Sequence, residues 1–309
     1  EADEQPPLSP QEPSCNGEDK RKEEDQNEGE EGEDELRPMC GRYEPENAAF
    51  FLMRRKGKSL SSGGFGIVLP RTVTVAADEN GDNGNGEKTT TSEDYLRLEE
   101  ALFLMERGVL ELQNQDGAEM PPQQVYNLLN STEAGMALPV YLAYAHLRQQ
   151  GFRVVRHSPE RRKVLHEMVT FQEATTTSGN EELDELTNNH IVNRKDQWTD
   201  LKLALREASV KAVPHYANST LTEPESPLLL AWDAYPPDQT FSRSAPGLPS
   251  FSVLVTSYNQ GTINFTQVTQ CIQENDPVPI KIATVSDSGI VVLFGVVSEG
   301  VPPMNQASS

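Results

Sequence analysis

The residues best suited by type and spacing to bind a negatively charged ligand form two short basic runs. The first comprises Arg153, Arg156, Arg161, Arg162 and Lys163, and the second comprises Arg54, Arg55, Lys56 and Lys58. Guanidinium and ammonium groups neutralise phosphates, so each run is a candidate contact for RNA. Neither run contains aromatic residues that could stack on bases, and a solvated surface is the competing interpretation of both.

The chain as a whole is strongly acidic. It has 26 Lys and Arg against 48 Asp and Glu, a net charge of −22 over 309 residues. A field of this sign disfavours nucleic acid over most of the surface, because phosphates are held mainly by positive charge. Any contact with RNA is therefore expected to be local.

The sequence offers little other site chemistry. Cys15, Cys40 and Cys271 are widely spaced, with no CxxC pair and no histidine at ligand spacing, so neither a structural zinc nor a disulfide framework is expected. His146 also lacks ligating neighbours and is interpreted as a packing or surface residue. The Gly-rich segment 61–66 lacks the spacing of a phosphate-binding loop and predicts a turn. We expect no metal, no cofactor and no small-molecule substrate.

Targeting and membrane signals are also missing from the sequence given. No window approaches the roughly 18 to 20 consecutive apolar residues of a membrane span. The first residues are acidic and polar, unlike a signal or transit peptide. An intracellular, soluble protein without a membrane partner is expected.

Composition divides the chain into four parts. Residues 1–36 hold 15 acidic residues and almost no large apolar ones, which predicts a disordered acidic tail. Residues 37–94 form a basic and Gly-rich segment with a flexible loop at 77–92. A helical or mixed domain is expected at 95–137, and a second domain at 138–300. Its polar insertion, 158–226, is expected to be mostly flexible and to carry one amphipathic helix.

Apolar periodicity predicts helices and strands in both domains. Apolar residues at helical spacing predict helices over residues 98–107, 121–130, 139–150, 196–208 and 264–274. Short apolar or alternating runs predict strands over 109–112, 152–156, 228–232, 251–255, 280–285 and 290–297. Ser286 to Gly289 is a hairpin turn between the last two strands. This order indicates an α+β chain with a central mixed sheet in its second domain.

Several segments, taken in order, resemble the tRNA-splicing endonuclease subunits, and most closely the non-catalytic structural subunit of the Sen-fifty-four type. They are LEEALFLMERGVLEL at 98–112, VYLAYAHLRQQGFRVVRH at 140–157, LAWDAYPP at 230–237 and APGLPSFSVLV at 245–255, with RRKGKSL at 54–60 upstream. The resemblance implies a small N-terminal domain followed by an endonuclease-like α/β domain.

The catalytic members of this family use Tyr, His and Lys to cleave pre-tRNA without a metal ion. Tyr235 falls at the family's Tyr position. No histidine follows it as far as Ser250, and the Lys position holds Val278, Pro279 or Ile280, with Lys281 one residue further on. A lone tyrosine, with a pKa near 10, cannot supply the missing acid or base at neutral pH. The sequence therefore predicts no catalytic residue, and a structural role for Tyr235.

The resemblance implies a nuclear heterotetramer in which this chain supports a catalytic subunit and helps to position pre-tRNA. The apolar hairpin at 280–297 is either a pairing surface or a central part of its own sheet. Two rival functions stay open. One is an active, metal-independent RNA endonuclease that uses Tyr235 and Lys281 with His157 or His215. The other is an interaction adaptor that binds basic partners through its acidic tail.

Overall fold

The computed structural model describes residues 38–54, 60, 64–74, 88–131, 136–177, 187–213, 230–237, 241–259 and 263–296. The chain divides into two units, Glu1–Arg37 and Pro38–Ser309. The tail expected at 1–36 lies outside the described residues, as do most of the loop expected at 77–92 and all side chains of the basic run at 54–58.

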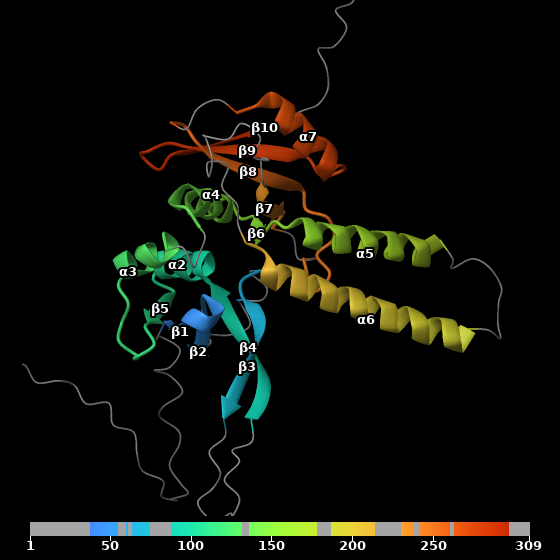
Figure 1. The fold of residues 1–309 in the computed structure, drawn as a ribbon, viewed down its shortest axis with the longest axis horizontal. Coiled ribbons are helices and arrows are strands. Elements are labelled where there is room, and N and C mark those ends of the chain that lie inside the picture. Colours follow the sequence, from blue (N-terminus) through green and yellow to red (C-terminus); the bar gives the residue numbers. More distant parts are fainter. Residues whose placement is uncertain are drawn as a thin grey trace, which may run out of the picture. The chain divides into compact units, whose positions relative to one another are not determined.

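The first sheet of the second unit has five strands in the order β3-β4-β2-β1-β5 (Figure 1). They are β1 Met39–Glu44, β2 Ala49–Arg54, β3 Ile67–Thr74, β4 Lys88–Arg97 and β5 Leu110–Gln113. Its pairs are antiparallel except β1 with β5, and a short 3₁₀ turn, Pro45–Asn47, connects β1 and β2.

No strand is predicted from the sequence for residues 37–94, whereas four strands begin there in the structure. Phe50 and Leu52 of β2 are buried in the core that the sheet shares with the following helices. Ala49 and Tyr95 form a smaller cluster with Leu69 of β3. These contacts are long-range; the local signal in the sequence is the apolar run at 48–53, which indicates β2.

Three helices precede the second sheet in the chain: α2 Leu98–Glu106, which contacts the first sheet, α3 Pro122–Leu129, which contacts α2, and α4 Leu138–Gln149, which contacts α2 and the second sheet. Each has a buried apolar face, as its periodicity predicts. Glu100 accepts a hydrogen bond from the Arg97 backbone N–H at 3.0 Å, which satisfies one of the free donors at the start of α2. Gly151, with φ of +91°, follows α4 and turns the chain into β6.

The second sheet has the order β10-β9-β8-β7-β6 and is mixed, with only β8 and β9 parallel. Its strands are β6 Arg153–Arg156, β7 Leu230–Tyr235, β8 Phe251–Ser257, β9 Ile280–Val285 and β10 Val291–Gly295. Helix α4 contacts this sheet, and Val253 of β8 joins its core. Leu254 belongs to the opposite cluster with Val268 of α7, Phe265–Asn275. The predicted α+β class and central mixed sheet are confirmed.

The polar insertion forms two helices, α5 Pro159–Thr177 and α6 Thr187–Lys211, where one was predicted. They lie side by side (Figure 1) and enclose Leu165, Met168 and Leu205. Phe171 of α5 stacks on Trp198 of α6, with 5.7 Å between ring centroids. The predicted helix at 196–208 lies within α6, whereas α5 was missed because its apolar residues are sparse and are buried by α6 and by Ala245 and Leu248.

One buried cluster contains residues of both sheets and of α2, α3 and α4. It runs from Met39 of β1 to Val285 of β9, on both sides of the boundary expected between residues 137 and 138. Tyr144 of α4 contacts Trp232 of β7, with centroids 5.1 Å apart, and the Trp232 Nε1–H donates to the Val140 carbonyl at 3.1 Å. The division of the chain into two domains between residues 137 and 138 stays a prediction. No helix in the described part of the chain is long and apolar enough to cross a membrane.

Candidate functional site

Tyr235, at the family's tyrosine position, ends β7 as a buried residue that is 2% exposed. Its hydroxyl accepts a hydrogen bond from Arg161 Nη2 at 2.8 Å and donates to the Gly247 carbonyl at 3.4 Å. Burial raises the pKa of Tyr235 to about 12, although Arg161 acts in the opposite direction. A buried phenol with so high a pKa is a poor general base at neutral pH, which agrees with the structural role predicted for it.

Asp233, two residues before Tyr235, is the centre of a buried polar network. Its Oδ1 accepts from Ser252 Oγ at 2.7 Å and lies 2.9 Å from His157 Nδ1, while its Oδ2 accepts from Arg161 Nη1 at 2.7 Å. Burial alone would raise the pKa of Asp233, but the contacts with His157 and Arg161 outweigh it and hold the pKa below its usual value. The network joins β7 to β8 and to the start of α5.

The alternative triad of Tyr235, Lys281 and a histidine does not assemble among the described residues. Side chains alternate across a strand, and Lys281 shares the face of Ala283 and Val285, which pack with the α4 core. Its Nζ lies 3.9 Å from the centroid of the Phe251 ring. Tyr235 points to the other face, since Ala234 beside it belongs to the α4 core.

The face of Tyr235 carries apolar residues where the family's lysine is expected. Ile280 pairs with Ser252, whose hydroxyl reaches Asp233 on that face, and both Val278 and Ile280 are buried. His157 is bound to Asp233, and His215 lies outside the described residues. Placing the family's lysine one residue later, at Lys281, does not complete the triad, because Lys281 lies on the face of β9 opposite to Tyr235.

The structure corrects the placement of two predicted RNA contacts. Arg161 and Arg162, at the start of α5, are 2% and 6% exposed. Arg161 holds Asp233 and Tyr235, and Arg162 Nη2 donates to the Asn275 carbonyl at 2.8 Å. Burial lowers the pKa of Arg162. Their charges serve contacts inside the fold, because this turn of α5 faces the second sheet.

The other three predicted contacts differ in accessibility. Arg156 makes a two-pronged ion pair with Glu99 of α2, both N···O distances being 2.7 Å. Arg153 is half-buried, and its guanidinium lies 5.2 Å from the Phe241 ring centroid. Lys163 is exposed. RNA binding by these residues stays a prediction, now best suited to Lys163 and Arg153.

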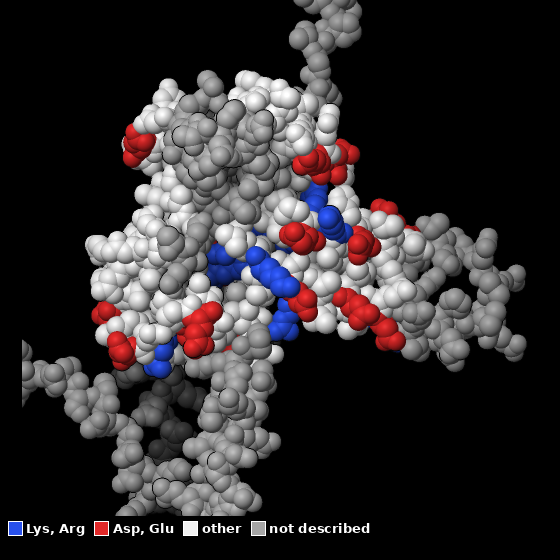
Figure 2. All heavy atoms as spheres, in the orientation of Figure 1, with Lys and Arg blue, Asp and Glu red and all other residues white. Residues whose placement is uncertain are grey.

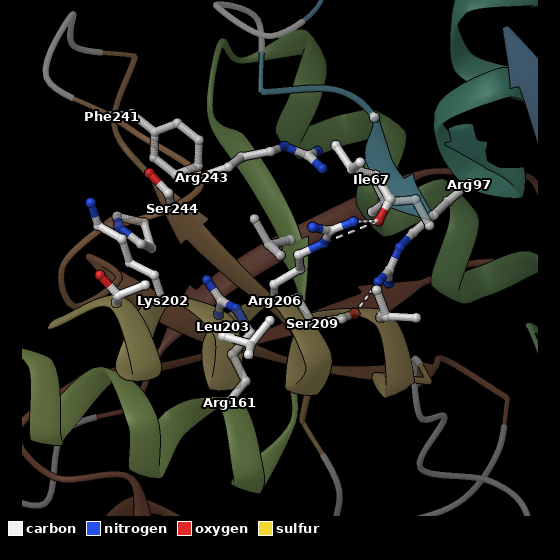
Figure 3. Close-up of a pocket in the computed structure, with 16 residues that line it drawn as sticks. Ile67, Arg97, Arg161, Lys202, Leu203, Arg206, Ser209, Phe241, Arg243 and Ser244 are labelled. Carbon is white, nitrogen blue, oxygen red and sulfur yellow. Dashed lines mark hydrogen bonds between the residues drawn. The ribbon is translucent and has the colours of Figure 1, made fainter. Parts of the chain in front are cut away.

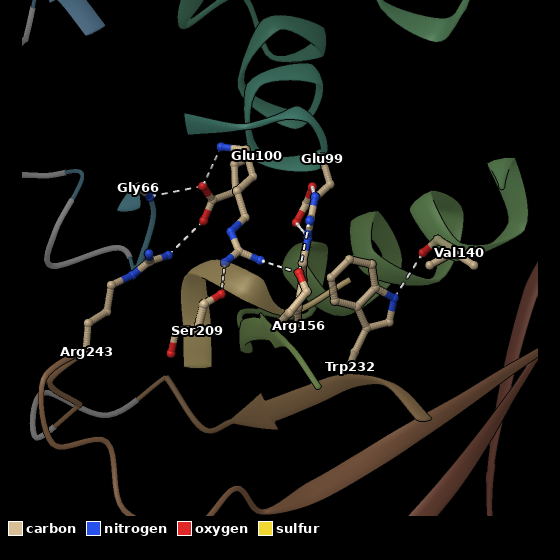
Figure 4. Close-up of polar contacts among 10 residues, drawn as sticks. Gly66, Glu99, Glu100, Val140, Arg156, Ser209, Trp232 and Arg243 are labelled. Atoms are coloured by element: carbon tan, nitrogen blue, oxygen red, sulfur yellow. Dashed lines mark hydrogen bonds and ion pairs between the residues drawn. The ribbon is translucent and has the colours of Figure 1, made fainter. Parts of the chain in front are cut away.

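Glu100 of α2 is a second buried carboxylate, and it connects the segment before β3 to the segment between β7 and β8. Its Oε2 accepts from the Gly66 backbone N–H at 3.1 Å, and its Oε1 lies 2.7 Å from Arg243 Nη2 (Figure 4). Gly66 adopts φ of +89°, and a Cβ there would lie 3.3 Å from the Tyr95 carbonyl. In the described part of this segment Gly64 lies in a turn, and the N–H of Gly66 binds a side chain of the protein itself; the turn predicted for 61–66 stays a prediction, because residues 61–63 lie outside the described residues.

Sequence reasoning missed a pocket of about 420 Å³ between β3, α6 and the segment that follows β7 (Figure 3). Its cationic lining residues are Arg97, Arg161, Lys202, Arg206 and Arg243. Four of these five lie outside the basic runs of the sequence, so no local pattern identifies them. Figure 2 shows Lys and Arg side chains gathered near the middle of the visible face, with carboxylates around them.

Strand β10 is a free edge of the second sheet in the described chain. Val291 and Leu293 pack against the core, whereas Val292 and Phe294 alternate outward and are 56% and 44% exposed. Ile290, just before the strand, is 64% exposed. An apolar edge strand of this kind is a template for pairing with another chain. Elsewhere, the described residues contain no group of three or more His, Cys, Asp or Glu placed to hold a metal ion.

Comparison with known proteins gives a consistent result. A family model described as the tRNA intron endonuclease N-terminal domain matches residues 85–126, which include all of β4, α2 and β5. A probable tRNA-splicing endonuclease subunit sen54 of Schizosaccharomyces pombe is 44% identical over 62 residues, 20% of this chain and 16% of the relative. The tRNA-splicing endonuclease subunit SEN54 of Eremothecium gossypii is 26% identical over 201 residues, 54% of this chain and 43% of the relative.

These matches span less than half the length of either curated relative. Both relatives are named as subunits of the same type, and the family model covers the helix and strand at 98–112, one of the segments that carry the sequence resemblance. The predicted resemblance is confirmed: this chain is similar to the Sen54-type subunits of tRNA-splicing endonucleases.

Proposed function

We propose that this chain is a non-catalytic structural subunit of a nuclear tRNA-splicing endonuclease. In this role it supports a catalytic subunit within a heterotetramer and helps to position pre-tRNA for intron excision. The observation that carries the proposal is the state of Tyr235, which is buried and bonded to Arg161 and Gly247. A base for a ribose hydroxyl must be within reach of its substrate, and this hydroxyl is already committed inside the fold.

The apolar edge of β10 supports the structural part of the proposal. Its outward residues, Val292 and Phe294, offer backbone pairing and apolar area to a second sheet. Pairing of this kind gives a catalytic subunit a continuous sheet without any contribution to the chemistry. The two curated relatives are named as endonuclease subunits, which is the setting the proposal requires.

The test is affinity purification of the tagged full chain from cells, followed by mass spectrometry and a pre-tRNA cleavage assay. We expect nuclease subunits and cleavage activity in the eluate, and no cleavage by the purified chain alone. The variant Tyr235→Phe should co-purify the same subunits and leave the cleavage rate within about twofold, because the phenol takes no part in proton transfer.

Two results would overturn the proposal. Cleavage by the chain alone, lost in Tyr235→Phe, would establish the active-endonuclease alternative. An eluate without nuclease subunits and without activity would leave the acidic-tail adaptor as the better description.

A further inference from the structure

Four oxidisable rings form a continuous series from the core of the second unit to its surface. Trp232 of β7, which is 0% exposed, has its ring centroid 5.1 Å from that of Tyr144 of α4. The Tyr144 and Tyr141 rings stack with centroids 6.5 Å apart, and Tyr126 of α3 meets Tyr141 edge-on at 6.0 Å. Tyr144 and Tyr141 are each 1% exposed, whereas Tyr126 is half-buried. Aromatic rings at these separations pack in contact, so the series offers a path for an electron.

Glu106, at the end of α2, binds the hydroxyls of the outer two phenols. The Tyr141 hydroxyl donates to Oε2 of Glu106 at 2.6 Å, and the Tyr126 hydroxyl donates to Oε1. Burial and the neighbouring carboxylate raise the pKa of both phenols, so each keeps its proton at neutral pH. The Glu106 side chain is itself exposed. One carboxylate therefore reaches two phenol protons and is in contact with water.

The position of Glu106 matters because the oxidation of a phenol needs a base. A phenol that loses an electron becomes a very strong acid, so it is oxidised readily only where a neighbouring group takes its proton. The radical cation of an indole is a far weaker acid, and the Trp232 Nε1–H donates to the Val140 carbonyl at 3.1 Å (Figure 4), which is not a base. An oxidised Trp232 is therefore expected to take an electron from Tyr141, whose proton acceptor is in place.

The second of the two tryptophans in the chain has different neighbours. Trp198 of α6 stacks on Phe171, and the Lys202 Nζ lies 5.5 Å from its ring centroid. A phenylalanine ring and an ammonium group do not give electrons to an indole radical, so these two contacts offer Trp198 no such path. The contrast between the two tryptophans makes the path from Trp232 testable within one protein.

We propose that Tyr144, Tyr141 and Tyr126 carry a one-electron oxidation of Trp232 from the core to the surface, with Glu106 as the proton acceptor. The oxidant is a small oxidising radical, such as the carbonate radical, which is reduced to carbonate when it takes the electron. Trp232 belongs to the main buried cluster, and the stable oxidation products of an indole carry polar groups that would be buried there. Moving the oxidation to Tyr126 keeps this damage out of the core.

The transfer balances in two steps. In the first, Tyr141 gives an electron to the Trp232 radical cation through Tyr144 and gives its proton to Glu106, which restores Trp232. In the second, Tyr126 gives an electron to the Tyr141 radical, while Glu106 returns a proton to Tyr141 and accepts the proton of Tyr126. The result is a phenoxyl radical on Tyr126 and one proton that Glu106 releases to water. A soluble thiol or ascorbate then reduces the radical at the surface.

The test is laser flash photolysis of the purified full chain carrying Trp198→Phe, in which Trp232 is the remaining tryptophan. A light pulse ionises the indole and ejects its electron into water, and transient absorption then follows the indole and phenoxyl radicals. The path variant is Tyr141→Phe, and the control variant is Tyr258→Phe, which removes a phenol that is 76% exposed and follows β8. A third variant, Glu106→Gln, keeps the shape of the side chain and removes the base.

We expect the indole radical to decay as the phenoxyl radical grows, at one rate that does not depend on protein concentration. Tyr258→Phe should keep this rate, and Tyr141→Phe should abolish the coupled phase. Glu106→Gln should slow it by about a hundredfold, the lower end of what a positioned proton acceptor contributes. In Tyr126→Phe the phenoxyl radical should form at the same rate but react more slowly with ascorbate, because Tyr141 is buried.

Other results would overturn the proposal. Equal kinetics in Tyr141→Phe and Tyr258→Phe would show that the electron comes from another phenol. A rate that rises with protein concentration would indicate transfer between molecules, and an unchanged rate in Glu106→Gln would exclude the carboxylate as the proton acceptor. Melting temperatures of all variants check the fold. If Tyr141→Phe melts lower than the parent, Glu106→Gln decides the question, because its side chain is exposed.

Discussion

At the scale of single residues, Asp233 holds together three parts of the second sheet. Its two oxygens bind side chains from β8, from the end of β6 and from α5, and all of these groups are buried. A buried carboxylate of this kind is stable only while its partners stay in place. Tyr235, which the sequence resemblance matches to the family's tyrosine, is thus part of a structural network through the shared contact with Arg161.

The variant Asp233→Asn should lower the free energy of unfolding by about 3 to 5 kcal/mol, because it leaves the Arg161 guanidinium buried without its counter-charge. Urea denaturation followed by circular dichroism measures this loss. Asp200→Asn is the matched control, since Asp200 is exposed on α6, and its effect should stay within about 0.5 kcal/mol. Similar stability of the two variants would contradict the role given to Asp233.

The candidate site could be predicted only in part at this scale. The sequence identified Tyr235 by its motif and showed that no histidine follows it before Ser250. It also identified the run at 161–163 as cationic, but it could not show that Arg161 and Arg162 face inward while Lys163 faces solvent. Which side of a helix faces inward depends on what the helix packs against. In α5 the apolar residues that would indicate this side are few.

At the scale of elements, β10 differs from every other strand of its sheet in carrying an exposed apolar face. Val292 and Phe294 point away from the core on a strand with one free edge in the described chain. The apolar hairpin at 280–297 left open whether these residues are a pairing surface or a central part of their own sheet. The sheet order decides that β10 is an edge, and pairing with another chain is its proposed use.

The variant Val292→Lys should reduce recovery of partner subunits in affinity purification by about tenfold or more, because a charged side chain would be buried at the interface. Val109→Lys is the control: Val109 is also an exposed valine, at 42%, and lies beside the first sheet. Both variants should melt at the wild-type temperature. Undiminished recovery with Val292→Lys would exclude β10 as the pairing edge.

Most elements with a strong apolar period were predictable, including α2, α3, α4, α7 and the strands of the second sheet. The failures have a common cause. Strands β1 to β4 and helix α5 are stabilised by partners distant in the sequence, and their own patterns are short or interrupted by polar residues. The cationic pocket belongs to the same class, since its residues come from separate elements and meet only in the folded chain.

At the scale of the whole second unit, two buried carboxylates couple stability to pH. The pKa of Asp233 and that of Glu99 are held below their ordinary values of 3.8 and 4.5, because neighbouring arginines and hydrogen bonds outweigh burial. A carboxyl whose folded-state pKa is depressed contributes stability that is complete above the unfolded pKa and is lost as pH falls through the folded pKa.

The urea midpoint of the wild-type chain should therefore change little between about pH 7 and about pH 5.5 and then fall steeply below about pH 4. In the double variant Asp233→Asn with Glu99→Gln, the midpoint should start lower and fall less on the acid side. Denaturation curves at a series of pH values measure both slopes. If the urea midpoints of the wild type and the double variant fell equally steeply at low pH, other carboxyl groups would be responsible for the pH dependence.

The place of β9 in the buried cluster determines when the fold can be completed during synthesis. Tyr141 and Tyr144 of α4 leave the ribosome early, whereas Ala283 and Val285, which belong to the same cluster, follow only after the insertion helices and three further strands of the chain have been made. Until then the apolar face of α4 lacks part of its packing surface. The core therefore closes only after β9, the strand beside β10, has been synthesised.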